Sequence, residues 1–160
     1  QEICFVPNDD YRTFLSTRMD APLAGPIVNL QGELVGHHTG LVNYTVGQRK
    51  GLGIAAPRPY YVVKLDMSRN TLVVGHEEEA NCQGLTANEV SWCAIGPQSE
   101  PFDCAVQIRY KSTPIPCTVT ATDNTFSLRF HEPQRAVTPG QWAVLYDGDA
   151  VLAAGIIQRA

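Results

Sequence analysis

The residues best suited to chemistry lie in the segment Tyr44–Gly53, where three glycines surround Gln48, Arg49 and Lys50. Glycine permits a positive φ and lets a partner approach the main chain closely. Turned backbone amides next to cations suit an oxyanion, and phosphate is the commonest large one. A tight turn that carries two solvated basic side chains explains the same pattern, so both interpretations stay open.

Cysteine supplies the second candidate chemistry, because a thiolate is a nucleophile. Cys4, between Ile3 and Phe5, would on its own be a small core residue. The count of five is odd and no pair has Cys-x-x-Cys spacing, so neither a zinc site nor a secreted disulfide framework is expected. We therefore predict no metal, a reducing cytoplasmic compartment, and buried strand positions for the other four, Cys82, Cys93, Cys104 and Cys117.

Composition places the 160-residue chain among globular proteins, since 44% of its residues are hydrophobic. The formal net charge of −4 argues against a generic nucleic-acid binder but leaves room for local basic patches. No run approaches the roughly 20 apolar residues of a membrane span, and the polar, acidic start lacks the pattern of a signal peptide. We expect no membrane association.

The first half of the chain is predicted to be β-rich with one short helix. Helical spacing in Tyr11–Leu15 follows the N-cap residues Asn8–Asp10. Two hairpins are expected, one turning at Gln31-Gly32 and one turning at Ser68–Asn70. The adjacent His37 and His38 should point in opposite directions.

The second half is predicted to be a small antiparallel β-barrel. The polar stretch 77–84 has little periodicity and suggests a boundary, which gives domains 1–82 and 83–160. Beyond it, apolar and polar residues alternate in 102–111 and 126–130. The runs 142–146 and 150–157 flank Asp147-Gly148-Asp149, which is another hairpin signal. Several short antiparallel strands favour a closed barrel, because closure removes exposed strand edges.

Arg109 and Lys111 are candidate phosphate contacts. In a regular strand they share the polar face about 7 Å apart, from a rise of about 3.3 Å per residue, which suits adjacent phosphates. Tyr110 would then point to the other face and pack inward with its hydroxyl satisfied. For Tyr110 to contact RNA, the strand would have to end or twist before it.

Over nearly its whole length the chain resembles the bacterial tRNA-specific 2-thiouridylases (tRNA-uridine 2-sulfurtransferases). The matching segments follow the order of that family and include Ile3-Cys4-Phe5, Gly25–Val28, His38–Leu41, Tyr44–Gly53, Tyr60–Val63, Leu72–Gly75, Ile108–Lys111 and Glu132–Gln141. Family members carry an ATP-binding domain and a first active-site cysteine before this point. We therefore interpret the chain as the C-terminal portion of such an enzyme.

The resemblance implies a role for particular residues. Cys4 would be the second active-site cysteine and hold sulfur as a persulfide, with an activating group that the sequence does not identify. Arg109, Tyr110 and Gln141 would contact tRNA, and Arg49 and Lys50 are added as tRNA contacts from their own pattern. Arg135 is either a further phosphate contact or a solvated side chain.

The resemblance also implies the reaction and its partners. The full-length enzyme would thiolate C2 of the wobble uridine of tRNA, with ATP and Mg²⁺ bound in the missing domain and no cofactor in this portion. We expect tRNA and a sulfur-carrier protein or cysteine desulfurase as partners, a monomeric cytoplasmic protein, and no activity of the chain alone. The alternatives are a non-enzymatic β-barrel that binds RNA or protein, with a structural Cys4, or a flavin- or metal-binding barrel.

Overall fold

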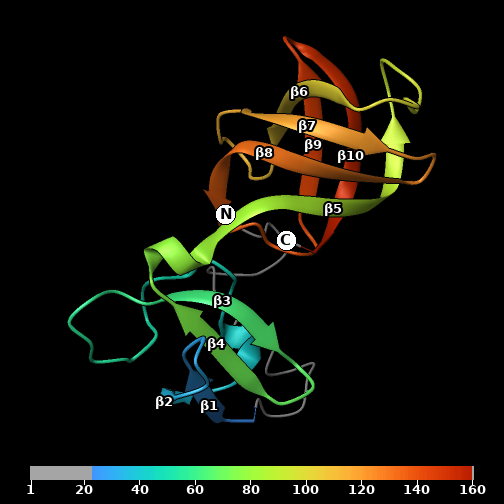
Figure 1. The fold of residues 1–160 in the computed structure, drawn as a ribbon. Coiled ribbons are helices and arrows are strands. Elements are labelled where there is room, and N and C mark those ends of the chain that lie inside the picture. The colour runs from blue at the N-terminus through green and yellow to red at the C-terminus, as the bar shows by residue number, and fades with distance from the viewer. Residues whose placement is uncertain (1–22, 160) are drawn as a thin grey trace, which may run out of the picture. The chain divides into compact units, whose positions relative to one another are not determined.

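A computed structural model describes residues 23–159 and shows a chain built mainly of strands (Figure 1). It divides into two compact units, Gln1–Glu79 and Ala80–Ala160. The predicted helix at 11–15 and the candidate Cys4 lie outside the described residues. Within the described part, no helix is long and apolar enough to cross a membrane.

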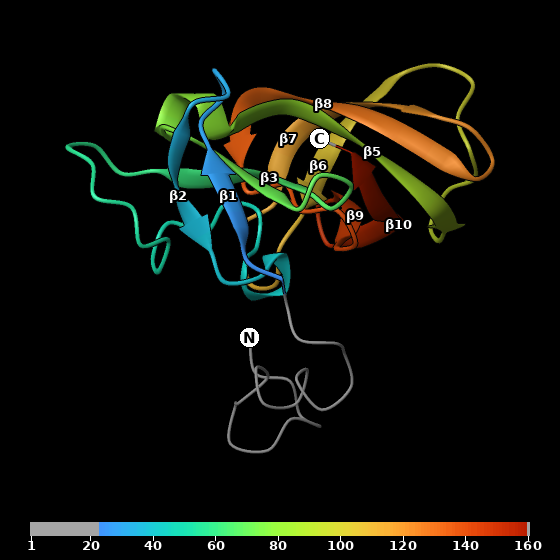
Figure 2. The same cartoon turned by 90° about the horizontal axis from the view of Figure 1, so that it is seen from below.

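The first unit contains a four-stranded sheet with the strand order β2-β1-β4-β3. Neighbouring strands are antiparallel, as β1 and β2 are in Figure 2, except for β1 and β4, which run parallel. Buried Ile27, Leu41, Leu52, Val62, Leu72 and Val74 form its core. The elements are β1 Gly25–Val28, β2 Leu34–His38, the 3-10 turn η2 Leu41–Asn43, β3 Tyr61–Asp66, β4 Thr71–Gly75 and the 3-10 turn η3 Glu77–Ala80.

Both predicted hairpins of this unit are confirmed. Between β1 and β2, Gly32 takes φ 83° and its amide donates to the carbonyl of Asn29. The Asn29 side chain accepts from the amides of Gln31 and Glu33, a local bond pattern that favours a turn. Between β3 and β4, Asn70 takes φ 47° at the end of the turn.

His38 fastens the β3–β4 turn to β2. Its side chain is 1% exposed, whereas His37 is exposed, so the predicted opposite directions are confirmed. The backbone N–H of Gly40 donates to Nδ1 of His38, so Nδ1 is the acceptor of the ring. The proton therefore lies on Nε2 of His38, which donates to the carbonyl of Asn70. The Asn70 side chain in turn donates to the carbonyl of Ala24. This buried imidazole is fully used in holding the fold.

The second unit is a closed six-stranded barrel with the order β10-β5-β8-β7-β6-β9, as the sequence predicted. All of its pairs are antiparallel. Its strands are β5 Asn81–Trp92, β6 Phe102–Gln107, β7 Ile115–Ala121, β8 Thr125–Arg135, β9 Trp142–Asp147 and β10 Ala150–Arg159.

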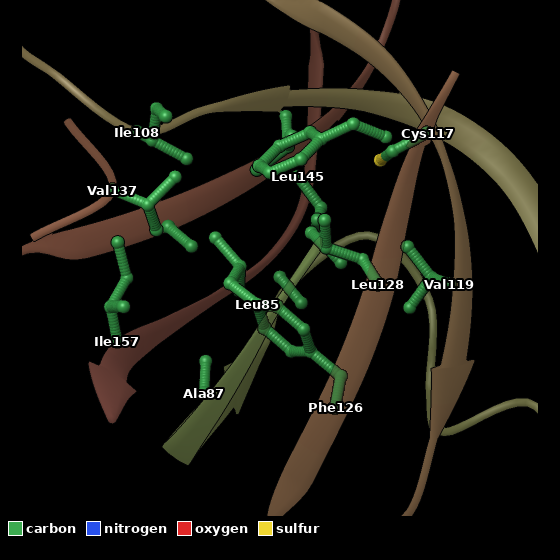
Figure 3. Packing of buried hydrophobic residues seen from close by; sticks show 14 of the residues in the cluster. Leu85, Ala87, Ile108, Cys117, Val119, Phe126, Leu128, Val137, Leu145 and Ile157 are labelled. Carbon is green, nitrogen blue, oxygen red and sulfur yellow. The ribbon is translucent and has the colours of Figure 1, made fainter. Parts of the chain in front are cut away.

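Side chains fill the interior of the barrel (Figure 3). The predicted alternation along β8 is confirmed, since Phe126, Leu128 and Phe130 are buried between exposed neighbours. Ile108, Val137 and Ile157 pack together toward one end of this core (Figure 3). Because the interior is packed with apolar side chains, chemistry and recognition must occur on the outside of the barrel or at its ends.

β5 closes the barrel by pairing with both β8 and β10. The sequence suggests residues 81–84 as part of a polar connection, but they are the first residues of β5. A register shift between Cys82 and Gly84 marks a bulge there. A Cβ atom added at Gly84 would overlap the carbonyl oxygen of Leu128, so the close approach of the two strands requires glycine.

We predict that Gly84→Ala destabilises the barrel by about 1–3 kcal/mol, because the clashing atom belongs to backbone that cannot rotate away. Gly96→Ala is the matched control, since nothing lies within 4 Å of a Cβ at Gly96. Urea denaturation of both variants measures the difference. Equal stability of the two variants would mean that the pairing of β5 with β8 does not require glycine at position 84.

Candidate nucleic-acid interface

One end of the barrel gathers the RNA contacts predicted from the sequence. The strand registers place the ends of β6, β8 and β10 beside the starts of β7, β5 and β9. The loops 108–114 and 136–141 therefore leave the barrel at the same end. We call these loops and the adjoining strand termini the basic end. Topology thus brings Arg109, Tyr110 and Gln141 to one end of the barrel.

Charge is segregated along the barrel. Of the five Lys and Arg residues in 80–160, four belong to the basic end, namely Arg109, Lys111, Arg135 and Arg159. Of the seven Asp and Glu residues, six lie toward the opposite end, namely Glu89, Glu100, Asp103, Asp123, Asp147 and Asp149. A polyanion is therefore attracted to one end and repelled from the other, although the net charge of the chain is negative.

β6 ends at Gln107, whereas its alternating pattern predicted a strand to Lys111. Ile108 still points inward and is 1% exposed. The chain then turns, because the amide and hydroxyl of Ser112 donate to the carbonyl of Arg109 at 3.2 and 2.8 Å. The Gln107 amide group donates to the carbonyl of Ser112 at 2.6 Å. The predicted shared strand face of Arg109 and Lys111 is therefore wrong.

Tyr110 is 73% exposed, so the prediction that it packs inward is also wrong. The condition set for its contact with RNA, a strand that ends before it, is met. Lys111 takes φ 58°, and its Nζ lies 5.2 Å from the centroid of the Tyr110 ring. Arg109 donates to the carbonyl of Arg135 at 3.1 Å, which ties the loop 108–114 to the end of β8.

Gln141 has a fixed backbone and an exposed side chain. The backbone N–H of Gln141 donates to the carbonyl of Thr138, and the backbone carbonyl of Gln141 accepts from the N–H of Ile157 at 2.8 Å. Trp142 follows as the first residue of β9 and is 51% exposed. Trp142 is not among the residues predicted from the sequence, because the run 142–146 is wholly apolar and its pattern does not indicate which side chains face outward.

The basic loop of the first unit has the backbone that its glycines predicted. The three glycines of Tyr44–Gly53 take φ of 83°, 76° and 68°. The Gln48 side chain accepts from the amide of Thr45 at 3.0 Å and donates to the carbonyl of Lys50 at 2.9 Å. This amide therefore braces the loop from within and does not point to a ligand.

Beside this loop lies a concavity of about 410 Å³, whose lining includes Arg49, Lys50, Arg58 and Tyr60. Arg58 was not anticipated, because its position depends on Glu78, twenty residues away. It donates to both carboxylate oxygens of Glu78 at 2.8 and 3.0 Å. A backbone N–H bond and the guanidinium of Arg58 hold the pKa of Glu78 below its ordinary value, because both favour the ionised carboxylate.

The described cysteines fit a structural role only in part. Cys117 is buried as predicted, but Cys93 follows β5 and is exposed, so its predicted burial is wrong. Cys104 and Cys117 are opposite one another on β6 and β7, with their sulfurs 3.8 Å apart. The hydrogen bond with the Cys104 thiol, together with burial, raises the pKa of the Cys117 thiol and makes it a poor nucleophile. Residues 23–159 contain no cluster of side chains suited to hold a metal ion.

The structure thus places the predicted residues in two groups. Arg109, Tyr110 and Gln141 share the basic end of the barrel. Arg49 and Lys50 line the concavity of the first unit. Cys4 lies outside the described residues.

Two family models match the chain. Residues 12–76 match a tRNA methyl transferase PRC-barrel domain, and residues 82–157 match an aminomethyltransferase β-barrel domain. Together with the fold, these matches define the chain as a pair of β-domains of the kind found in tRNA-modifying enzymes.

Curated relatives narrow this class. The chain is 48% identical to the tRNA-specific 2-thiouridylase MnmA of Symbiobacterium thermophilum, 49% to that of Geobacter metallireducens and 47% to that of Nostoc punctiforme. The matches cover 100%, 100% and 99% of this chain but 42%, 44% and 46% of the relatives, and they fall in the C-terminal part of the relatives. The chain belongs to the tRNA-specific 2-thiouridylase family and spans less than half the length of these members.

We predict that Glu78→Gln strengthens the binding of inorganic pyrophosphate at the concavity by up to about five-fold. The change frees Arg58 from an exposed ion pair, and such pairs are individually weak. Amide chemical shifts of Gly51 and Gly53 during a pyrophosphate titration measure the affinity. Glu100→Gln, which alters net charge equally on the barrel, is the control. A gain of the same size in the control would show that only overall charge matters.

Proposed function

We propose that this chain supplies the tRNA-docking surface and the sulfur-bearing cysteine of an enzyme that thiolates C2 of the wobble uridine in tRNA. Residues 1–82 would carry the cysteine and residues 83–160 the docking barrel. The observation that carries the proposal is the convergence of Arg109, Tyr110 and Gln141 at one basic end of the barrel. It is joined by the family membership of the chain.

Each group at the basic end suits a different part of RNA. Arg109 and Lys111 offer cations to phosphates, which dominate the affinity of protein for nucleic acid. Gln141 offers an amide that both donates and accepts, which fits a ribose hydroxyl or a base edge. Because Arg109 is braced by the carbonyl of Arg135, little side-chain freedom remains to be lost when it binds.

The basic loop of the first unit is proposed as a second contact with tRNA. Arg49 and Lys50 are exposed beside the concavity, and Arg58 adds a third cation to its lining. Phosphate chemistry is favoured because the glycine-rich backbone leaves the main chain open to close approach. Both sites therefore address the RNA backbone with cations on braced loops.

Cys4 is proposed to deliver the sulfur. ATP with Mg²⁺, bound elsewhere in the full-length enzyme, would convert the C2 oxygen of the uridine into a leaving group as AMP. The terminal sulfur of the Cys4 persulfide would form a bond to C2 while the C2–O bond breaks. A thiolate of the other active-site cysteine would then attack the Cys4 sulfur, which leaves both electrons of the broken S–S bond on the sulfur of the base.

The proposed reaction also requires partner proteins that supply the sulfur. A sulfur-carrier protein or cysteine desulfurase would load Cys4, and the reaction would take place in the cytoplasm with a monomeric enzyme. The target uridine would leave its stack to be reached.

The competing function is a non-enzymatic RNA- or protein-binding barrel with a structural Cys4. We predict that Cys4 reacts with iodoacetamide at least as fast as the exposed Cys93, because sulfur transfer requires an accessible thiolate. Mass spectrometry of partly alkylated chain compares the two sites directly. Protection of Cys4 to the level of the buried Cys117 would favour the competing function.

We predict that the chain binds tRNA with an affinity that falls steeply as salt rises, because phosphate contacts release counterions. Arg109→Ala should lower the slope of log affinity against log salt by about 1, whereas Arg129→Ala should leave it nearly unchanged. Arg129 is an exposed arginine in the middle of β8 and is therefore the matched control. Electrophoretic mobility shifts at several salt concentrations provide the measurement. Equal slopes for both variants would contradict docking through the basic end.

A further inference from the structure

The basic end carries two exposed aromatic side chains that the phosphate contacts do not explain. Tyr110 is 73% exposed and Trp142 is 51% exposed. They belong to different loops and strands, yet topology brings both to the same end of the barrel. Exposed tyrosine and tryptophan are enriched at binding surfaces, so their presence beside the proposed phosphate contacts points to a ligand that uses their rings.

The direction of Trp142 follows from β9. Ala143 and Leu145 are fully buried, so Trp142 lies on the outer face of the strand. The β6–β9 register pairs Gln107 with Val144, so the chain just beyond β6 and the start of β9 leave the same seam of the barrel. Arg109 follows Gln107 by two residues, and Gln141 directly precedes Trp142. The indole therefore belongs to the same surface as the proposed docking groups.

The chemistry of this surface favours a nucleotide base over an apolar protein partner. An aromatic ring flanked by cations and an amide matches the pattern of proteins that bind single-stranded nucleic acid, where bases stack on aromatic faces and cations follow the backbone. Lys111 lies over the Tyr110 ring, which presents a ring and a charge side by side. In A-form duplexes the bases are already stacked, so only an unpaired base can use these rings.

We propose that Trp142 stacks on an unpaired base of the bound tRNA, with Tyr110 as a second ring of the same surface. The basic end would then recognise a single-stranded nucleotide of a loop, bulge or end as well as the phosphate backbone. This inference rests on the proposed function, because it requires that RNA occupies the basic end. It assigns Trp142 a binding role that charge alone does not provide.

Tryptophan fluorescence tests the proposal with an internal reference. The chain has two tryptophans, and the other one, Trp92, ends β5 at the opposite end of the barrel, where it donates to the carbonyl of Asp123. Stacking on a base quenches indole fluorescence. A short single-stranded oligouridylate is therefore titrated into the chain, into Trp142→Phe and into Trp92→Phe. Inorganic polyphosphate serves as the charge-only probe, and circular dichroism checks folding.

We expect saturable quenching by oligouridylate in the unchanged chain and in Trp92→Phe, and none in Trp142→Phe. Trp142→Ala should bind oligouridylate about 5- to 150-fold more weakly but bind polyphosphate with unchanged affinity. Quenching that survives in Trp142→Phe would overturn the proposal. So would an equal loss of affinity for both probes, or self-association of the chain that Trp142→Ala abolishes.

A second comparison separates failure of this inference from failure of docking. A tRNA transcript is bound by the unchanged chain, by Trp142→Ala and by Arg109→Ala. If Arg109→Ala weakens binding and Trp142→Ala does not, docking through the basic end stands and stacking by Trp142 is wrong. If neither variant changes tRNA binding, the docking proposal itself fails, and the stacking proposal fails with it.

Discussion

The barrel depends on closure by β5, which must pair with β8 on one side and with β10 on the other. On the β8 side, Gly84 lets the strand approach the carbonyl of Leu128 closely. Once six antiparallel strands are closed, alternate loops must leave at opposite ends. The loops 108–114 and 136–141, far apart in sequence, therefore emerge together. Closure thus determines which side chains can act on one ligand.

Recognition by the barrel depends on charged side chains placed at one of its ends. The barrel interior is filled by apolar side chains, so it offers no room for a substrate. Recognition is left to braced loops: Arg109 is held by the carbonyl of Arg135, and the loop of Arg49 is held by the amide of Gln48. Cations fixed in this way bind anions with a smaller loss of side-chain entropy than freely moving ones.

Alternation and turn residues were enough to predict the hairpins of the first unit, the strand β8 and the closed barrel, because these depend on local patterns of burial. The end of β6 could not be predicted, since the pattern continues to Tyr110 while the bonds from Ser112 and Gln107 stop the strand. Arg58 joins the concavity through Glu78, a contact that no local pattern encodes. Identification of Cys4 came from resemblance to a family, because neither Ile3 nor Phe5 suggests reactivity.

The turns 122–124 and 148–149 and the connection 93–101 all lie at the end of the barrel opposite Arg109. None of the proposed contacts involves them, and exposed tips of this kind tolerate insertion well. This end is therefore free to vary in length during evolution, and it offers a place to attach a dye or a fused domain. Such an addition would leave the opposite rim of the barrel accessible.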